Sequence, residues 1–150
     1  MRREEEVTRD FRFPVVTIPG LVLTKIIAYL DRPEERTRDL IDILYCFEHY
    51  ETNPGTSRRF DLPESQVNDA LLKYEEAGAF LLGIEVAAPA KPNSLAIVWR
   101  FVETISDEFV RPISQILAEE KRLVDNDARC GALYRLFQVF AAGVNQTQNR

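Results

Sequence analysis

The sequence has little of the residues that build most catalytic and metal sites. Among its 150 residues are one histidine, two cysteines and one methionine. Because His49 is the only imidazole, acid–base catalysis has few candidate groups. Cys46 and Cys130 lie far apart without motif spacing, which favours free buried thiols in a reducing cytosol over a disulfide framework. The chain also has no P-loop, no nucleophile elbow and no Cys–His catalytic signature.

Long hydrophobic runs and an excess of basic charge are missing too. No segment approaches the roughly 18 apolar residues of a membrane span. The N-terminal "MRREEEVTRD" is charged and lacks the apolar centre of a secretory signal. We therefore expect a cytoplasmic protein without a membrane partner. The net charge of −5 argues against a nucleic-acid partner, because such proteins carry a basic footprint.

The residues that are present suit one helical domain. The length is that of one ordinary domain, and the apolar (45%) and charged (29%) fractions are typical of globular proteins. We expect a single domain over 1–150, with a charged lead-in at 1–12 and a frayed polar tail at 144–150. The pattern predicts a mainly α fold, a bundle of five to six helices with one short N-terminal strand at Phe11–Ile18.

Proline, glycine and asparagine separate the predicted helices. Pro19–Gly20 is interpreted as a turn before an apolar helix at Leu21–Leu30. Gly78 and Gly83 weaken a later helix, so we expect them to serve close packing against another helix. The remaining helices are predicted at about 37–50, 61–86, 94–111 and 112–121, and after the acidic cap at 125–127.

One lysine, Lys25, stands inside the otherwise apolar first helix. Its ammonium could extend to water, pair with a carboxylate, or point into a cleft and bind an anion. Asp39 and Asp42 share one face of the next helix, and the short connector favours antiparallel packing. A Lys–Asp link that pins the two helices together is the structural interpretation. An anion site built from the lysine and nearby arginines is the functional one. These arginines are Arg32, Arg36 and Arg38.

The order of these features resembles a known family. The segment "VVTIPGLVLTKIIAYLDRPEERTRDLIDI", Val15–Ile43, is similar to the third and fourth motifs of the AbiEii/AbiGii-type nucleotidyltransferases. These proteins are toxin-related members of the DNA polymerase β-like superfamily. The segment "KYEEAGAFLLGIEVA", Lys73–Ala87, resembles their helical part. The resemblance is specific over the first segment and looser to about residue 120, and the last helix matches no motif of the group.

Because of their charge and place in the sequence, Arg36 and Arg38 belong with Lys25 in the predicted phosphate site. The resemblance itself implies roles for three residues: Lys25 would contact the nucleotide phosphates, and Asp39 and Asp42 would support the lysine. It implies no catalytic residue and no metal ligand here, because the Gly-Gly or Gly-Ser turn and the Asp-x-Asp pair that bind Mg²⁺ in the family are not found. Mg²⁺ and a nucleoside triphosphate would be needed only if the metal-binding half were supplied.

These features lead us to expect a truncated or split nucleotidyltransferase-like protein that is inactive as this chain alone, and they leave its status as an enzyme open. Its partner would be a separate N-terminal half or an antitoxin. An alternative is a non-catalytic helical interaction module or homo-oligomer, which would use surface exposed by loss of the sheet domain. A third hypothesis is an unknown enzyme that uses Lys25 and the acids in another way.

Three further patterns each have a structural interpretation that we prefer. Asp42, Cys46 and His49 share a helical face that could hold a metal, but zinc needs a fourth ligand and a second shell. The "DND" at 125–127 has carboxylates two residues apart, and at a helix start such residues cap. Four aromatic residues could stack bases, but their helical spacing favours the core. They are Trp99, Phe101, Phe137 and Phe140.

Overall fold

A computed structural model describes residues 16–50, 76–106, 111–120 and 126–148 of the chain. This part is helical and contains no strand, so the predicted mainly α fold is confirmed. None of its helices is long and apolar enough to cross a membrane. The helices are α1 (Ile18–Asp31), α2 (Thr37–His49), α4 (Ala77–Ala87), α5 (Pro92–Ser106), α6 (Arg111–Glu120) and α7 (Asn126–Gln146).

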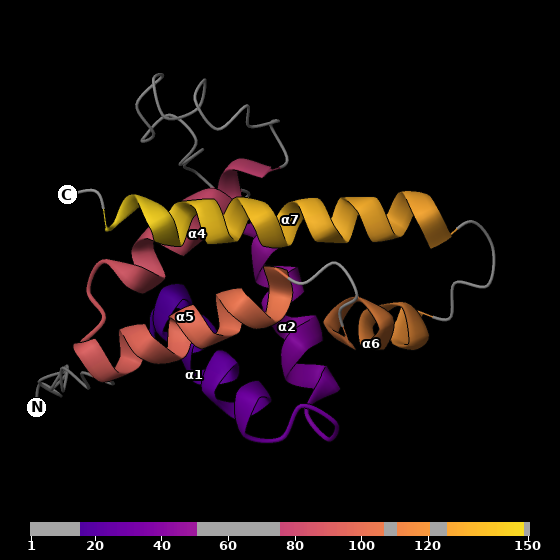
Figure 1. Cartoon of the computed structure of the whole chain (residues 1–150), viewed down its shortest axis with the longest axis horizontal. Coiled ribbons are helices and arrows are strands. Elements are labelled where there is room, and N and C mark those ends of the chain that lie inside the picture. Colours follow the sequence, from indigo (N-terminus) through magenta and orange to yellow (C-terminus); the bar gives the residue numbers. More distant parts are fainter. Residues whose placement is uncertain (1–15, 51–75, 107–110, 121–125, 149–150) are drawn as a thin grey trace, which may run out of the picture.

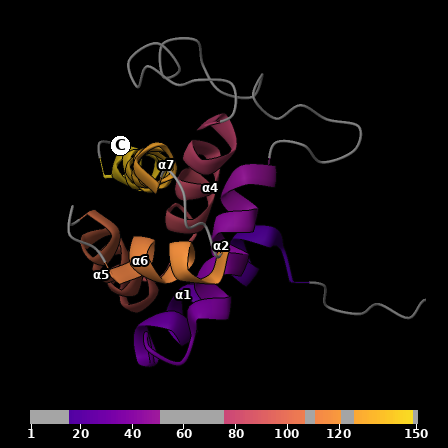
Figure 2. The same cartoon turned by 90° about the vertical axis from the view of Figure 1, so that its right-hand side faces the viewer.

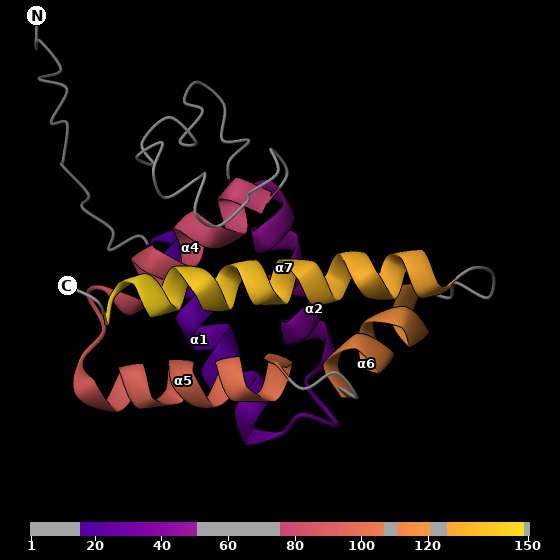
Figure 3. The ribbon, with the colours of Figure 1, turned by 45° about the horizontal axis from the view of Figure 1, so that its top comes forward.

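The longest helix, α7, organises the arrangement. It runs along one side of the molecule, and α5 lies roughly alongside it in two views (Figures 1 and 3). Figure 2, which looks nearly along α7, places α4 beside this helix and α5 and α6 below it. The most extensive contact between elements joins α4 to α7, and the next joins α1 to α2. The α4–α7 contact is part of the core, and Lys25 lies at the α1–α2 contact.

Two glycines let the backbones of α4 and α7 touch. A Cβ added at Gly83 would lie 2.3 Å from the carbonyl oxygen of Phe140. A Cβ added at Gly143 would lie 2.1 Å from the carbonyl oxygen of Phe80. No side chain fits at either position without separating the helices. The predicted packing role of Gly83 is therefore confirmed, and Gly78 is buried in the same helix.

Aromatic side chains fill the centre of the molecule. Phe47 of α2 stacks on Phe140 of α7, with ring centroids 4.6 Å apart. Phe137 and Phe101 complete the cluster through edge-to-face contacts with these two rings. All four rings are fully buried, so the core interpretation of Phe101, Phe137 and Phe140 is confirmed. Trp99 is only half-buried, and its indole Nε1 has no hydrogen-bond partner in the described part.

The beginning of α1 corrects the sequence interpretation. Ile18, the predicted last strand residue, is the first residue of the helix, and Val16 and Thr17 pair with no strand in the described part. The hydroxyl of Thr17 accepts a hydrogen bond from the Gly20 amide at 3.2 Å and caps the helix. Pro19 lies in the first turn, where a missing N–H costs nothing. Pro19–Gly20 therefore starts the helix rather than turning the chain.

Other helix boundaries agree to within a few residues. The second helix ends at His49 with Tyr50 as its C-cap, and α5 begins at Pro92. The short helix before residue 121 begins at Arg111, one residue earlier than predicted. Of the helix predicted over 61–86, only the end, as α4, is among the described residues.

The structure describes the C-terminal end of the chain as far as residue 148 but not the N-terminal residues 1–15. The charged lead-in at 1–12 and the strand residues 11–15 lie outside the described residues. At the other end, α7 continues through residue 146, and Val144 is fully buried. The first three residues of the predicted tail thus continue the helix, because the apolar face of α7 extends further than the polar composition suggested.

Candidate functional site

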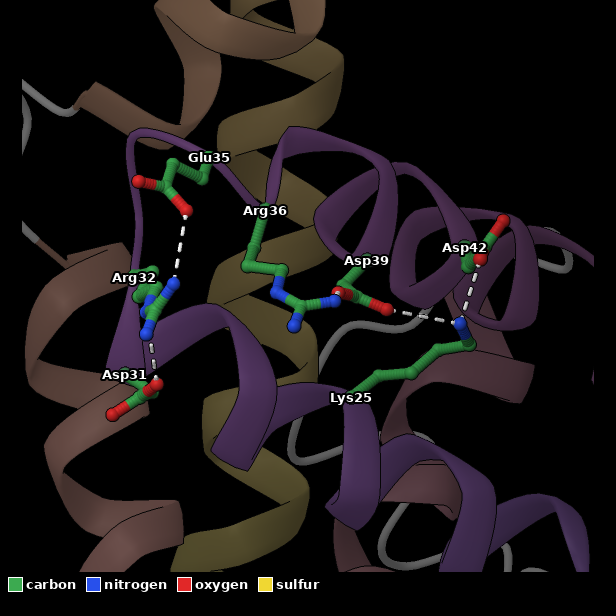
Figure 4. A network of polar contacts seen from close by, with 7 residues as sticks. All are labelled: Lys25, Asp31, Arg32, Glu35, Arg36, Asp39 and Asp42. Carbon is green, nitrogen blue, oxygen red and sulfur yellow. Dashed lines mark hydrogen bonds and ion pairs between the residues drawn. The ribbon is translucent and has the colours of Figure 1, made fainter.

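Lys25 is held between two carboxylates of the neighbouring helix. Its Nζ lies 3.1 Å from Oδ1 of Asp39 and 2.7 Å from Oδ2 of Asp42 (Figure 4). The i, i+3 spacing places both acids on the side of α2 that faces α1. The lysine side chain is 20% exposed and the Asp39 side chain 16%. The Lys–Asp link predicted from spacing therefore exists, and it joins α1 to α2.

The carboxylates keep Lys25 charged. The hydrogen bond that Lys25 donates to Asp42 is the largest cause that raises the pKa of its ammonium above 10.5, while burial acts in the opposite direction. The bond to Asp39 and the negative charges of both acids raise the pKa further. The site thus contains a permanent point charge whose position is fixed by two acceptors.

Replacement of Lys25 by methionine should cost stability at neutral pH and cost less at alkaline pH. Because the folded pKa is raised, the stabilisation is complete below 10.5 and is lost as the pH rises through the folded pKa. We expect Lys25→Met to lower the free energy of unfolding by about 1 kcal/mol at pH 8. Urea unfolding followed by circular dichroism at pH 8 and above pH 10.5 measures the difference, and a gap that widens with pH would contradict the assignment.

The arginines separate into three groups. Arg36 extends towards the site, with Nη1 3.7 Å from Oδ2 of Asp39. Arg32 pairs instead with Asp31 and Glu35, away from the lysine (Figure 4). Arg38 is exposed and makes no hydrogen bond or ion pair within the described part of the chain. The structure therefore brings Arg36 to the lysine site, and leaves Arg32 outside it.

A cavity of about 480 Å³ lies beyond Asp42, between α2, α6 and α7. Arg38 and Asp42 line it, together with Tyr45 from the next turn of α2 and Glu119 from α6. Lys25 does not line this cavity, nor does it line three further cavities between the described helices. The ammonium thus lies at a helix junction next to the cavity, with Asp42 shared between the two.

Gln115 of α6 fixes the connector between α1 and α2. Its Nε2 donates to the carbonyl oxygen of Pro33 at 2.7 Å and to Oγ1 of Thr37 at 3.1 Å. Its Oε1 accepts from the hydroxyl of fully buried Tyr29 at 2.8 Å. Sequence reasoning missed this residue, because a single glutamine on a polar helix carries no pattern that marks a long-range contact.

Removal of the Gln115 amide should loosen this connector. In Gln115→Met the volume is similar, but the Tyr29 hydroxyl and the Pro33 carbonyl lose their partner. We expect a loss of about 2 kcal/mol in the free energy of unfolding. The double variant with Tyr29→Phe, which removes the orphaned hydroxyl, should recover part of this loss. Denaturant unfolding of the two variants measures the coupling, and strictly additive costs would contradict the contact.

Arg129 ties the start of α7 to two other helices. Its guanidinium donates two hydrogen bonds to Glu120 of α6, at 3.1 and 2.6 Å. A third, at 3.3 Å, goes to Glu48 of α2. This bidentate geometry suits arginine, and the three bonds join the start of α7 to α6 and to the last turn of α2. Arg129, Glu48 and Glu120 therefore form a charged part of the cavity wall.

The face of α2 that carries Asp42, Cys46 and His49 has other contacts. Asp42 bonds Lys25, and the ring of His49 stacks on Tyr45 while its Nδ1 lies 2.9 Å from the Tyr45 carbonyl oxygen. Burial is the main cause that raises the pKa of the half-buried Cys46 thiol, so this thiol stays protonated. Among the described residues, no three His, Cys, Asp or Glu side chains are placed to hold a metal ion.

Comparison with known proteins gives one family. Residues 2–126 match the family described as "Nucleotidyl transferase AbiEii toxin, Type IV TA system". The match covers most of the chain and ends at the first residue of α7. No curated protein and no solved structure matches the chain significantly.

Proposed function

The chain belongs to the AbiEii nucleotidyl transferase toxin family, and from this premise we propose that its α1–α2 pair contacts the phosphates of a nucleoside triphosphate through Lys25. Asp39 and Asp42 would hold the ammonium in position, and Arg36 and Arg38 would add positive charge. The family match carries the proposal, and the fixed position of the Lys25 ammonium between two carboxylates supports it.

The hydrogen-bonding capacity of Lys25 supports this role. An ammonium has three donors, and the two carboxylates occupy two of them. In the described part of the chain the third donor has no protein acceptor. A phosphate oxygen on the 20% exposed side could accept it. The lysine would then act as a compact point charge on a triphosphate.

The positive and negative charges around Lys25 cancel, so the binding of an anion needs a further cation. Lys25 and Arg36 balance Asp39 and Asp42, so these four groups alone give no net attraction for an anion. Arg38 would supply the excess positive charge, since it pairs with no described residue. The Lys–Asp link also accounts for Lys25 as a helix–helix contact, and a binding measurement separates the two roles.

Nucleotidyl transfer also needs groups that the described helices do not offer. In such reactions carboxylate-bound Mg²⁺ ions activate the attacking oxygen and neutralise the triphosphate. The described residues do not fit a Mg²⁺ site, so no metal-dependent step is assigned to them. We propose that a separate N-terminal half provides the carboxylates, and that this chain alone binds a nucleotide without transferring it. An antitoxin is a further proposed partner, in line with the family description.

Calorimetric titration with tripolyphosphate tests the phosphate contact. The wild-type chain should bind this anion, and Lys25→Met should bind it at least about tenfold more weakly, since one charge-assisted hydrogen bond is removed. Lys91→Met is the matched control, because Lys91 is exposed on the α4–α5 connector, away from the site. Equal affinities for all three proteins, or no binding to the wild type, would reject the proposal.

A second function, a helical interaction module, is favoured by an apolar surface at the start of α1. Val16, Ile18 and Leu21 are 63%, 41% and 37% exposed. Thr17, Pro19 and Gly20, which lie between them in the sequence, line a mostly apolar cavity of about 450 Å³ between α1 and α4. Such surface is typical of contacts between chains. Light scattering should then give an oligomer that Ile18→Asp dissociates, and a monomeric wild type would count against this function.

A further inference from the structure

One aromatic pair on α2 has no part in the core or in the proposed phosphate contact. Tyr45 is 62% exposed, whereas the other large aromatic side chain of this helix, Phe47, is fully buried. The imidazole of His49 stacks on the Tyr45 ring, with centroids 4.1 Å apart and planes 19° apart. The imidazole covers one face of the phenol ring, and a second flat group could continue the stack on the other face.

The exposed ring borders a half-open cavity next to the lysine site. Tyr45 and Asp42 both line the cavity of about 480 Å³ between α2, α6 and α7. A volume of this size lies in the range of small-molecule sites. Because Asp42 also bonds Lys25, the cavity lies directly beside the proposed phosphate contact.

Several charged side chains that line the cavity already form ion pairs within the protein. Asp42 pairs with Lys25, and Arg129 pairs with both Glu120 and Glu48, so that this last trio keeps one net negative charge. Among the described residues, the lining then retains one cation and one anion without an ion pair, Arg38 and Glu119. A ligand that fits this lining carries an anionic end, a flat ring and hydrogen-bond donors.

We propose that this cavity receives the base and ribose of the nucleotide whose phosphates contact Lys25, with the base stacked on Tyr45. The inference rests on the proposed function and adds the nucleoside subsite to it. Arg38 and Tyr45 are seven residues apart on one helix face, about 10 Å along its axis. This separation suits a triphosphate at one end and a base at the other. The Glu119 carboxylate accepts a hydrogen bond from a ribose hydroxyl or a base amino group.

Calorimetric titration of the full chain with ATP, GTP, CTP, UTP and tripolyphosphate tests the subsite. At least one nucleotide should bind more tightly than tripolyphosphate. Tyr45→Ala should weaken nucleotide binding about tenfold, the size of one base–aromatic stack, and leave tripolyphosphate binding unchanged. Tyr45→Phe, which keeps the ring, should retain the wild-type affinity. Because Tyr45 is exposed, both variants should keep the thermal stability of the wild type.

The outcomes separate this inference from the function on which it rests. Nucleotide binding that depends on Lys25 but is the same in Tyr45→Ala overturns the subsite alone. Nucleotide binding that falls in Tyr45→Ala but is unaffected by Lys25→Met, with no binding of tripolyphosphate, overturns the phosphate contact and retains the base site. No binding of any of the five ligands overturns both.

Discussion

Gly143→Ala should lower the free energy of unfolding by about 3 kcal/mol, one of the largest losses expected from any single substitution in this chain. The new Cβ would lie 2.1 Å from the Phe80 carbonyl oxygen and 3.2 Å from the Gly83 Cα. Both atoms belong to backbone that cannot rotate away, so α4 and α7 would have to separate. The gain in helix propensity, up to about 1 kcal/mol, offsets only part of this cost.

The same substitution elsewhere in α7 provides the control. Gly131 is exposed, and a Cβ added there meets nothing within 4 Å. Gly131→Ala should therefore raise the free energy of unfolding by about 0.5 to 1 kcal/mol. Urea unfolding followed by circular dichroism compares the two variants directly. If Gly143→Ala were as stable as Gly131→Ala, the close contact of the two backbones would be wrong.

Phe140→Ala should cost about 3 to 5 kcal/mol, comparable to the whole stability of a small domain. Phe140 is fully buried, and its ring contacts Phe47 of α2 and Phe101 of α5. Removal of the ring leaves a cavity at the point where three helices meet. The variant should therefore be largely unfolded at 37 °C.

The loss should extend to the lysine site, because Phe47 anchors the helix that carries Asp39 and Asp42. Circular dichroism at 37 °C and tripolyphosphate titration of Phe140→Ala measure both effects. Ile27→Ala is the control, since Ile27 is 44% exposed on α1 and its truncation should change stability by no more than about 0.5 kcal/mol. A folded Phe140→Ala protein with the same melting temperature as Ile27→Ala would contradict the proposed core.

Local patterns in the sequence predicted much of the fold. Helical spacing predicted α2 within one residue and the buried stripe of α7, because each depends on residues within a few turns. Spacing also placed Asp39 and Asp42 on one face, and the short connector made a link from Lys25 to one of them an alternative; the structure shows links to both. The start of α1 was missed because proline followed by glycine is as typical of a turn as of a helix N-terminus.

The sequence did not allow contacts between distant segments to be predicted. Gly83 was predicted to pack closely, but its partner Gly143 could not be named, because nothing local marks which helices will cross. Gln115 and the exposed ring of Tyr45 were missed for the same reason. The role of a single polar or aromatic residue on a helix can be recognised only when the position of the neighbouring elements is known.

The most direct measurement of the phosphate contact observes the Lys25 ammonium itself. Hydrogen bonds to two carboxylates should slow its proton exchange and make its ¹⁵N resonance visible by NMR, assigned by its disappearance in Lys25→Met. On titration with tripolyphosphate this resonance should shift in a saturable way, while circular dichroism stays constant. A Lys25 resonance that does not move at any tripolyphosphate concentration would show that the lysine only joins α1 to α2, and would contradict the proposed function.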